Sequence, residues 1–343
     1  MVGSMVSGCQ SIHRVEIGMN LHFRGDDAAT IKRQFDLMAA MNVTWVRVDV
    51  DWSLVEPEQS QLDWVSSDLI VDEAVAHRMN VLLVLAYTPD WSRTSATDDS
   101  SPINHLRPVD STSYANFARV AAVRYASRGV HNWEIWNEPN STKFWPPRPN
   151  PDEYGALFRV VRTAIRDVDP KARLLIGGLA PQYHPSDVAG AAYLDQLYSN
   201  GTAQLADGIA VHPYSFPVLP MDIDAQASGG FKDVPALHAV MDRHGDGQKK
   251  IWITEFGAPT GTGSGAVSDQ DQATALEQAR QRVARWDWAG PLFYYELVDG
   301  GTDLNEIEQN FGVLRVDLTL KPAAVALTQN ASSQLLSWST AER

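Results

Sequence analysis

The amino-acid sequence predicts a single α/β domain, a (β/α)₈ TIM barrel in which eight parallel strands close into a ring. Eight short apolar runs alternate with eight longer stretches of helical periodicity, at about 40 residues per unit. The runs are apolar almost without interruption, as expected of parallel strands that are covered on both faces. The length of 343 residues suits one domain of this class.

The strands are predicted from runs rich in Val, Ile, Leu and aromatic residues. The second run reads V-T-W-V-R-V, the third V-L-L-V-L-A and the seventh K-I-W-I-T-E. The eight expected strands cover residues 16–20, 43–48, 81–86, 132–137, 173–178, 208–212, 250–255 and 292–295.

A helical pattern follows each of these runs. In the first, Ile31, Phe35 and Met38 share one face, and Asp26 and Asp27 stand where acidic residues favour a helix N-terminus. No G-x-G-x-x-G follows the first strand, which argues against a dinucleotide-binding sheet. We expect residues 1–14 to form a disordered leader and residues 15–343 to form the barrel. The expected helices cover residues 27–41, 65–79, 108–127, 151–167, 189–198, 234–244, 269–286 and 323–336.

The composition excludes several classes of partner. Lys and Arg number 28 against 42 Asp and Glu, which gives a net charge of −14. This charge repels phosphate backbones and anionic lipid, so we expect neither nucleic acid nor a membrane surface as a partner. No apolar run reaches the length of about 18 residues that a membrane-spanning helix needs.

The single cysteine, Cys9, excludes an internal disulfide. It ends the tetrapeptide V-S-G-C, which resembles the bacterial lipobox, in which the cysteine is lipidated. This interpretation predicts a secreted or cell-envelope protein. Only eight residues precede Cys9, so a plain leader sequence is the alternative.

Two glutamates stand at the ends of expected strands. Glu138 follows the fourth strand and precedes Pro139, and Glu255 ends the seventh strand shortly before Gly257. Strands four and seven face each other across an eight-stranded barrel, and active sites lie at the C-terminal ends of barrel strands. A lone glutamate at a strand end is more often a surface ion pair. Two that converge on one cavity suit glycoside hydrolysis, which needs one protonated and one ionised carboxyl group.

The surrounding residues resemble a known group of enzymes. Residues 133–140 read W-E-I-W-N-E-P-N and residues 251–257 read I-W-I-T-E-F-G, which resemble the two catalytic motifs of clan A retaining glycoside hydrolases. Asn20 with His22, and T-P-D-W at 88–91, are most similar to family 39 and its neighbours. The resemblance implies that Glu138 is the acid/base and Glu255 the nucleophile.

The same resemblance implies roles for four further residues. Arg47 ends the second strand, where the clan has an arginine that keeps the nucleophile ionised; a structural pair with Asp49 or Asp51 is the alternative. Asn137 matches the asparagine that binds the sugar 2-hydroxyl. His212 and Tyr214 follow the sixth strand, where the clan often has a histidine near the acid/base and a tyrosine near the nucleophile.

Other candidate substrate-binding residues lie in the expected loops of the catalytic face. His22 follows the first strand, and Trp91 and Trp145 lie in loops where exposed indoles could stack on sugar rings. At the eighth strand many clan members have a tryptophan, and this chain has Tyr295 and Glu296. Tyr295 is a candidate for the stacking role. Glu296 either contacts sugar hydroxyls or forms a salt bridge.

The sequence therefore predicts a monomeric retaining glycoside hydrolase that acts on a β-linked carbohydrate and needs no metal or other cofactor. Glu138 protonates the leaving group while Glu255 attacks the anomeric carbon. One alternative is a sugar-binding barrel without catalysis. Another is a metal-dependent barrel hydrolase, which the scattered histidines do not favour because none has H-E-x-x-H spacing.

Overall fold

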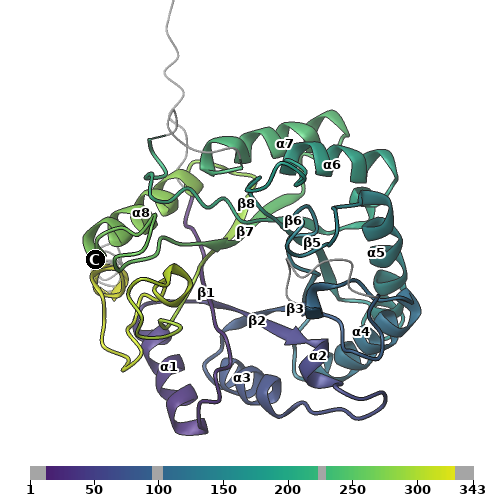
Figure 1. Cartoon of the computed structure of the whole chain (residues 1–343), viewed down its shortest axis with the longest axis horizontal. Coiled ribbons are helices and arrows are strands. Elements are labelled where there is room, and N and C mark those ends of the chain that lie inside the picture. Colours follow the sequence, from purple (N-terminus) through teal and green to yellow (C-terminus); the bar gives the residue numbers. More distant parts are fainter. Residues whose placement is uncertain (1–12, 95–102, 223–228, 329–343) are drawn as a thin grey trace, which may run out of the picture.

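The computed structural model describes residues 13–94, 103–222 and 229–328. Eight parallel strands form one closed barrel, in sequence order from β1 to β8, and β8 pairs with β1 to complete the ring. The predicted (β/α)₈ fold is confirmed, and Figure 1 shows the helices around the ring of strands. The strands are β1 Ile17–Asn20, β2 Trp45–Asp51, β3 Asn80–Ala86, β4 Asn132–Ile135, β5 Arg173–Leu179, β6 Gly208–Val211, β7 Lys250–Phe256 and β8 Ala289–Tyr294.

The helices follow the predicted order, with differences at a few ends. They are α1 Ala28–Ala40, α2 Trp52–Val55, α3 Val65–Ala76, α4 Ser111–Ala126, α5 Pro151–Arg166, α6 Gly190–Ser199, α7 Val234–Arg243 and α8 Asp269–Val283. The short α2 was not expected, and α8 ends three residues before the expected Trp286. The last helix is described only over residues 322–328, so the rest of the expected 323–336 lies outside the described residues.

Strand β8 begins earlier than the sequence indicated. Gly290 and Pro291 are typical of a loop, yet both lie in the strand. A Cβ at Gly290 would lie 2.9 Å from the Trp252 ring, so the glycine leaves room for that indole on the neighbouring strand. Packing against β7 therefore outweighs the local preference.

The floor of the barrel is filled by large apolar side chains from alternate positions of the strands. Trp45 meets Trp252 edge to face at 5.0 Å between ring centroids, and Phe293 packs on Trp45 at 6.1 Å. A Cβ on Gly18 would lie 2.2 Å from the Phe293 ring, so glycine is required there. The inner cluster consists of Trp45, Leu82, Leu175, Ala210, Trp252 and Phe293. This plug makes the interior a packed core, as in other barrels of this class.

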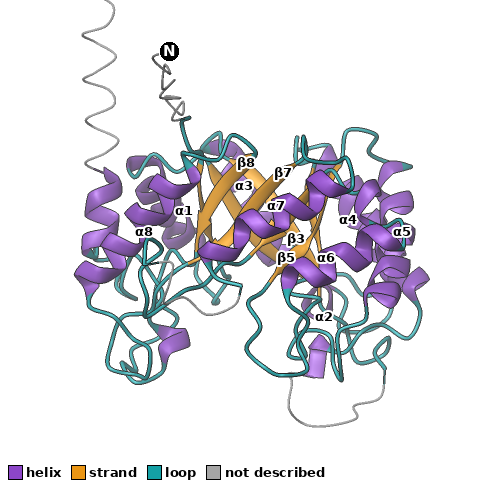
Figure 2. Ribbon diagram, turned by 90° about the horizontal axis from the view of Figure 1, so that it is seen from above, coloured by secondary structure: helices purple, strands orange, loops and turns teal. Residues whose placement is uncertain are grey.

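The long connections between strands and helices gather at one end of the barrel. Figure 2 shows these loops on one side of the strands, and they follow the strands' C-terminal ends. Several helices begin with a side-chain cap: Asp27 accepts from Thr30 N, and Ser268 accepts from Asp271 N. The caps fix where the loops stop and so define the edges of this face.

Three expectations from the sequence concern the leader, the location of the protein and membrane-spanning helices. His13 N donates to Ala284 O at 3.0 Å, within the residues expected to form a leader. Cys9 lies outside the described residues, and the cell-envelope location stays a prediction. In the described ranges no helix is long and apolar enough to cross a membrane.

Gly178 lies in an irregular part of β5 and approaches His212 closely, and this approach yields a stability prediction. The register between β5 and β6 shifts between Ile176 and Leu179. A Cβ on Gly178 would lie only 1.9 Å from His212 Nε2. Gly178→Ala should therefore lower the free energy of unfolding by about 1–3 kcal/mol through overpacking. Gly190→Ala is the control, because its nearest neighbours would stay 3.6 Å away. Equal urea-denaturation midpoints for the two variants would contradict the prediction.

Candidate active site

Glu138 is placed by an unusual turn directly after β4. The strand ends at Ile135, and both Trp136 and Glu138 then have positive φ angles, of 68° and 44°. This left-handed conformation costs a non-glycine residue roughly 1–2 kcal/mol, and such residues cluster at functional sites. Glu255 needs no such turn, because it is the last residue but one of β7. Both carboxyl groups line the same cavity.

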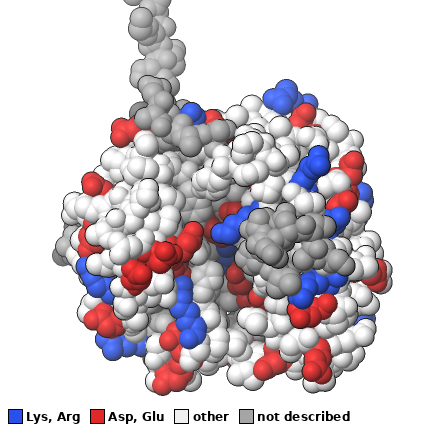
Figure 3. Space-filling view, viewed as in Figure 1, with Lys and Arg blue, Asp and Glu red and all other residues white. Residues whose placement is uncertain are grey.

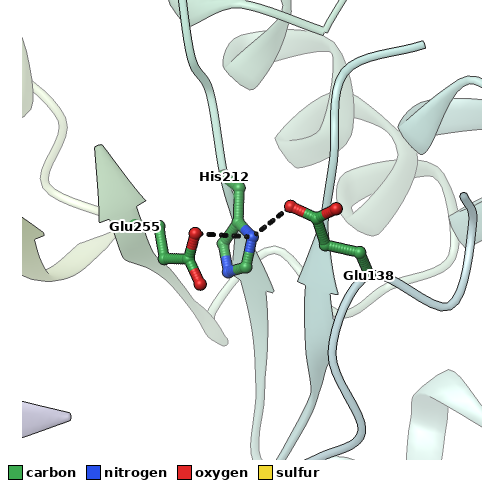
Figure 4. A group of neighbouring side chains, drawn as sticks. All are labelled: Glu138, His212 and Glu255. Atoms are coloured by element: carbon green, nitrogen blue, oxygen red, sulfur yellow. Dashed lines mark hydrogen bonds and ion pairs between the residues drawn. The ribbon is translucent and has the colours of Figure 1, made fainter. Parts of the chain in front are cut away.

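The two glutamates lie close together on either side of His212. One carboxylate oxygen of each lies within 4.8 Å of the other. His212 Nδ1 is 2.9 Å from Glu138 Oε1 and 3.5 Å from Glu255 Oε2, as Figure 4 shows. The imidazole itself is fully buried just beyond the end of β6. His212 Nδ1 therefore lies between the two carboxylates.

Arg47 forms a buried network that reaches Glu255. Its guanidinium donates two bonds to Glu134, at 2.9 and 3.1 Å, and one each to Glu255 at 2.6 Å, Asn20 at 2.9 Å and Asn137 at 3.0 Å. These five bonds use all five N–H donors of an arginine. Arg47 is 2% exposed. The alternative that Arg47 is a structural partner of Asp49 or Asp51 is therefore wrong, because all five of its donors bind residues outside β2.

The surroundings of the two carboxyl groups shift their pKa values in opposite directions. Burial raises the pKa of Glu138 more than the hydrogen bond from His212 lowers it. Burial also raises the pKa of Glu255, but the charges of His212 and Arg47 and the hydrogen bond from Tyr214 outweigh it, so the net shift is downward. The Tyr214 hydroxyl donates to Glu255 Oε2 at 2.8 Å. At neutral pH Glu255 is thus held as the carboxylate, while Glu138 retains its proton more readily.

The cavity above these residues has a volume of about 500 Å³. Figure 3 shows a hollow near the middle of this face, with acidic and basic side chains at its edge. Its polar lining includes His22, Asp49 and Asn137. Its aromatic lining consists of Tyr87, Phe144, Tyr183, Tyr214, Phe216, Tyr295 and Phe311. Such a mixture of aromatic rings and a few polar groups is typical of a ligand pocket.

In the described part of the chain, Glu138, His212 and Glu255 also form the one group whose ligand atoms lie near enough for a metal ion. A cation there would face the Arg47 guanidinium bound to Glu255, and it would have to displace the His212–Glu138 hydrogen bond. The existing partners leave the carboxylates suited to proton transfer and nucleophilic attack rather than to metal binding.

Comparison with known proteins agrees with this geometry. Residues 10–290 match the family model for cellulase (glycosyl hydrolase family 5). The chain belongs to glycosyl hydrolase family 5. Because family 5 lies in clan A, the clan resemblance expected from the two motifs is confirmed.

Each individual relative aligns with only part of its own length. A β-xylosidase of Geobacillus stearothermophilus is 42% identical over 124 residues, which are 33% of this chain and 23% of that protein. Among solved structures, a family 39 glycoside hydrolase from Bacteroides cellulosilyticus WH2 has a TM-score of 0.72 at 23% identity, over 93% of this chain and 64% of that one. A monomeric β-xylosidase from Caulobacter crescentus CB15 has a TM-score of 0.67 at 17% identity, over 92% and 67%. The chain thus spans about two thirds of these structures, which show the shared fold.

Most of the residues predicted from the sequence lie at the cavity that Glu138 and Glu255 line. Arg47 and His212 lie behind the carboxylates and contact them. Of the residues predicted from the sequence, those that line the cavity itself are Glu138, Glu255, Asn137, Tyr214, His22 and Tyr295.

The two loop tryptophans do not line the cavity. Trp145 is 1% exposed and packs edge to face on Trp136 and Tyr154, so the expectation that it stacks on a sugar is wrong. Trp91 is partly exposed, but its ring packs on Trp52 and its Nε1 donates to Glu56 O at 2.9 Å. Both indoles anchor the loops that carry them, because each ring packs on other aromatic side chains of the protein.

Glu296 is an ion-pair partner at the edge of the site. Its carboxylate accepts from Arg24 at 2.6 Å, lies 3.8 Å from His22 Nε2 and is 1% exposed. Of the two interpretations left open by the sequence, the salt bridge is the one that the structure contains. Oε1 of Glu296 has no hydrogen-bond partner among the described residues.

Sequence reasoning missed Glu134, which is fully buried in β4 and binds Arg47. Glu134 Oε1 also accepts from Gly178 N at 2.8 Å. A signal was present, because a charged residue inside an apolar strand must have a buried partner, and Arg47 is the matching cation in β2.

The network predicts a pH-dependent cost of removing Arg47. Arg47→Met leaves Glu255 and Glu134 buried without their cation, which should cost about 3–5 kcal/mol of unfolding free energy at pH 7. In the wild type the depressed pKa of Glu255 stabilises the fold above the ordinary carboxyl pKa, and this contribution is lost as the pH falls through the folded value. The cost of the substitution should therefore shrink toward pH 4.

Urea denaturation at pH 7 and pH 4 measures this difference. Arg33→Met, at an exposed position of α1, is the control and should cost little at either pH. A penalty for Arg47→Met that grows as the solution becomes acidic would contradict the assignment.

Proposed function

We propose that this chain is a retaining glycoside hydrolase that cleaves a β-linked carbohydrate by double displacement. The observation that carries the proposal is the pair Glu138 and Glu255, with carboxylate oxygens within 4.8 Å. Retaining enzymes hold their two carboxyl groups about 5–5.5 Å apart, whereas inverting enzymes need about 6.5–9.5 Å to admit water. The short separation supports direct attack by one of the two groups.

The opposite pKa shifts support the division of roles. Glu255, kept ionised by His212, Arg47 and Tyr214, attacks the anomeric carbon and forms a covalent glycosyl ester. Glu138, whose pKa is raised by burial, donates its proton to the leaving oxygen. Once Glu255 is esterified, its charge is gone, and Glu138 ionises more easily. Glu138 then takes a proton from water, which releases the sugar.

The position of Asn137 supports a contact with the sugar at the reacting carbon. Its side chain lines the cavity beside Glu138, and its Oδ1 accepts from Arg47 Nη2, which leaves the amide N–H₂ to donate. A donor at this point can bind the 2-hydroxyl, a contact that strengthens in the transition state. The two carboxyl groups complete both steps, so the proposed reaction needs no cofactor.

The substrate proposed is a neutral β-linked sugar, with β-xylosides and β-glucosides as first candidates. The curated relative is a β-xylosidase, and the family description is cellulase. Asp49 and Glu308 line the cavity besides the two glutamates, and these acidic groups disfavour a sugar acid. We also propose that the enzyme acts as a monomer, as the similar enzyme of Caulobacter crescentus is described. A panel of p-nitrophenyl β-D-glycosides, with the anomer of the first product followed by NMR, tests the proposal.

The two glutamates should respond differently to azide. Glu138→Ala should still react with 2,4-dinitrophenyl glycosides, because a good leaving group needs little protonation, and azide should accelerate its turnover and give a β-glycosyl azide. Glu255→Ala should lose retaining turnover on every substrate, because no covalent intermediate can form. Product analysis by NMR measures both outcomes.

Glu58→Ala, at an exposed position, serves as the control and should keep full activity. If azide instead rescues Glu255→Ala with a β product, the roles of the two glutamates are reversed. If wild-type enzyme binds sugars but cleaves no glycoside of the panel, the alternative of a non-catalytic sugar-binding barrel holds.

The hydrogen bond from Tyr214 predicts a shift of one limb of the pH profile. The acid limb of kcat/KM reports ionisation of Glu255, and the basic limb reports loss of the proton from Glu138. Tyr214→Phe removes a bond that lowers the pKa of Glu255, so the acid limb should move to higher pH while the basic limb stays in place. A profile that moves only at its basic limb would contradict this prediction, because the tyrosine would then act on Glu138 rather than on Glu255.

A further inference from the structure

A lysine ammonium is buried at the start of the last helix, beside the loops that follow β7 and β8. Lys321 is 2% exposed and directly precedes the helical residues 322–328. Its Nζ donates to Asp299 Oδ1 at 2.7 Å, to Thr260 Oγ1 at 2.9 Å and to Asn310 O at 3.3 Å. These three bonds use all three donors of an ammonium group. None of these four residues lines the catalytic cavity, so the cluster is separate from the reacting groups.

The ammonium fixes the backbone on both sides of Phe311, in the loop after β8. On one side, Asn310 O accepts from the ammonium and also from Thr260 N, at 2.9 Å. On the other side, Gly312 N donates at 2.9 Å to the same aspartate oxygen that accepts from the ammonium. If one of these partners moves, a buried charge loses a hydrogen bond, which is costly. The loop after β7, the loop after β8 and the last helix are therefore held in one arrangement.

A buried glutamine of α8 holds the same segment. Gln272 is fully buried, and its Nε2 donates to Ala258 O at 3.0 Å and to Phe311 O and Gly312 O, both at 3.2 Å. Figure 1 shows the loop after β8, in yellow-green, beside α8. The backbone at Phe311 is thus held by the last helix through Lys321 and by α8 through Gln272.

The Phe311 ring connects this fixed segment to the tyrosine that binds Glu255. It is 3% exposed and meets the Tyr214 ring edge to face, at 5.9 Å between centroids. It also packs edge to face on Phe216 at 5.5 Å and on Tyr295 at 5.3 Å. Tyr214 in turn donates to Glu255 Oε2 at 2.8 Å. Because closely packed rings tolerate little displacement, the position of Phe311 determines where the tyrosine hydroxyl lies.

We propose that Lys321 is a positioning residue for the nucleophile and that it acts through Phe311 and Tyr214. This inference rests on the proposed function, because it takes Glu255 to attack as the carboxylate. The ammonium contacts none of the reacting atoms. It fixes the ring on which Tyr214 packs, and so it keeps the phenol within hydrogen-bond distance of Glu255. Loss of the ammonium should lengthen that hydrogen bond and let the pKa of Glu255 rise.

The pH dependence of covalent trapping isolates this effect. The reagent is the 2,4-dinitrophenyl 2-deoxy-2-fluoro-β-glycoside of whichever sugar the glycoside panel identifies. An oxygen of Glu255 bonds to the anomeric carbon, and the bond to the aryl oxygen breaks to release dinitrophenolate. This good leaving group needs little protonation, so trapping depends on ionised Glu255 far more than on Glu138. The acid limb of the trapping rate against pH therefore reports the ionisation of Glu255.

Lys321→Met should move this acid limb to higher pH by about half a pH unit. The shift should be smaller than that of Tyr214→Phe, because the hydroxyl is displaced rather than removed. Thr260→Val removes one of the three ammonium bonds and should move the limb in the same direction by less. In the Tyr214→Phe background neither substitution should move the limb further, because the bond through which Lys321 acts is already gone. Lys171→Met, at an exposed position before β5, is the control and should leave the limb in place.

Urea denaturation of every variant separates positioning from stability, because Lys321→Met leaves Asp299 without its cation. A lower denaturation midpoint with an unmoved acid limb would overturn the proposal, since Lys321 would then be structural only. Equal shifts with and without the Tyr214 hydroxyl would also overturn it, since the effect would then reach Glu255 by another route.

Two further variants decide the question if Lys321→Met does not fold. Lys321→Met combined with Asp299→Asn removes both charges and keeps an acceptor for the amide of residue 312, and Thr260→Val keeps the buried ion pair. An unmoved acid limb in both would overturn the positioning role and leave the proposed function intact. Failure of the wild type to be trapped by any fluoroglycoside would overturn the proposed function, and the role of Lys321 with it.

Discussion

The buried guanidinium of Arg47 is the constraint on which the site depends. A charged group with 2% exposure is tolerated only if every donor is paired, and its five N–H groups bind Glu134, Glu255, Asn20 and Asn137. These partners come from β1, β4, β7 and the segment after β4, so one side chain ties opposite walls of the barrel together. The position of Glu255 therefore depends on the closed arrangement of the strands that Arg47 connects.

The chemical difference between the two glutamates follows from this network. Both side chains are largely buried, so burial by itself would raise both pKa values. Of the two glutamates, only Glu255 accepts hydrogen bonds from Arg47 and Tyr214. His212 lies between the two carboxylates. Two residues of the same type therefore acquire pKa shifts of opposite direction through their neighbours.

Features of this protein that depend on a few neighbouring residues could be predicted from the sequence, and features that depend on distant residues could not. Strand positions came from short apolar runs and helix positions from a periodicity of about 3.6 residues, and both signals need only a short window. The early start of β8 was missed because Gly290 makes room for Trp252, a residue of the neighbouring strand. Trp145 was misjudged because a sequence shows that an indole lies in a loop, but not that it turns inward onto Trp136.

The sequence by itself indicated the barrel and the two glutamates at its rim, because apolar runs and strand ends are local properties and eight strand–helix units favour a closed barrel. Only the tertiary structure decided which charges meet. Arg47 and Glu255 are 208 positions apart, and His212 and Glu138 are 74 apart, so both contacts exist only once the ring has closed. The sequence thus specified the two glutamates, while closure of the barrel shifts their pKa values in opposite directions, because pKa values depend on neighbours in space.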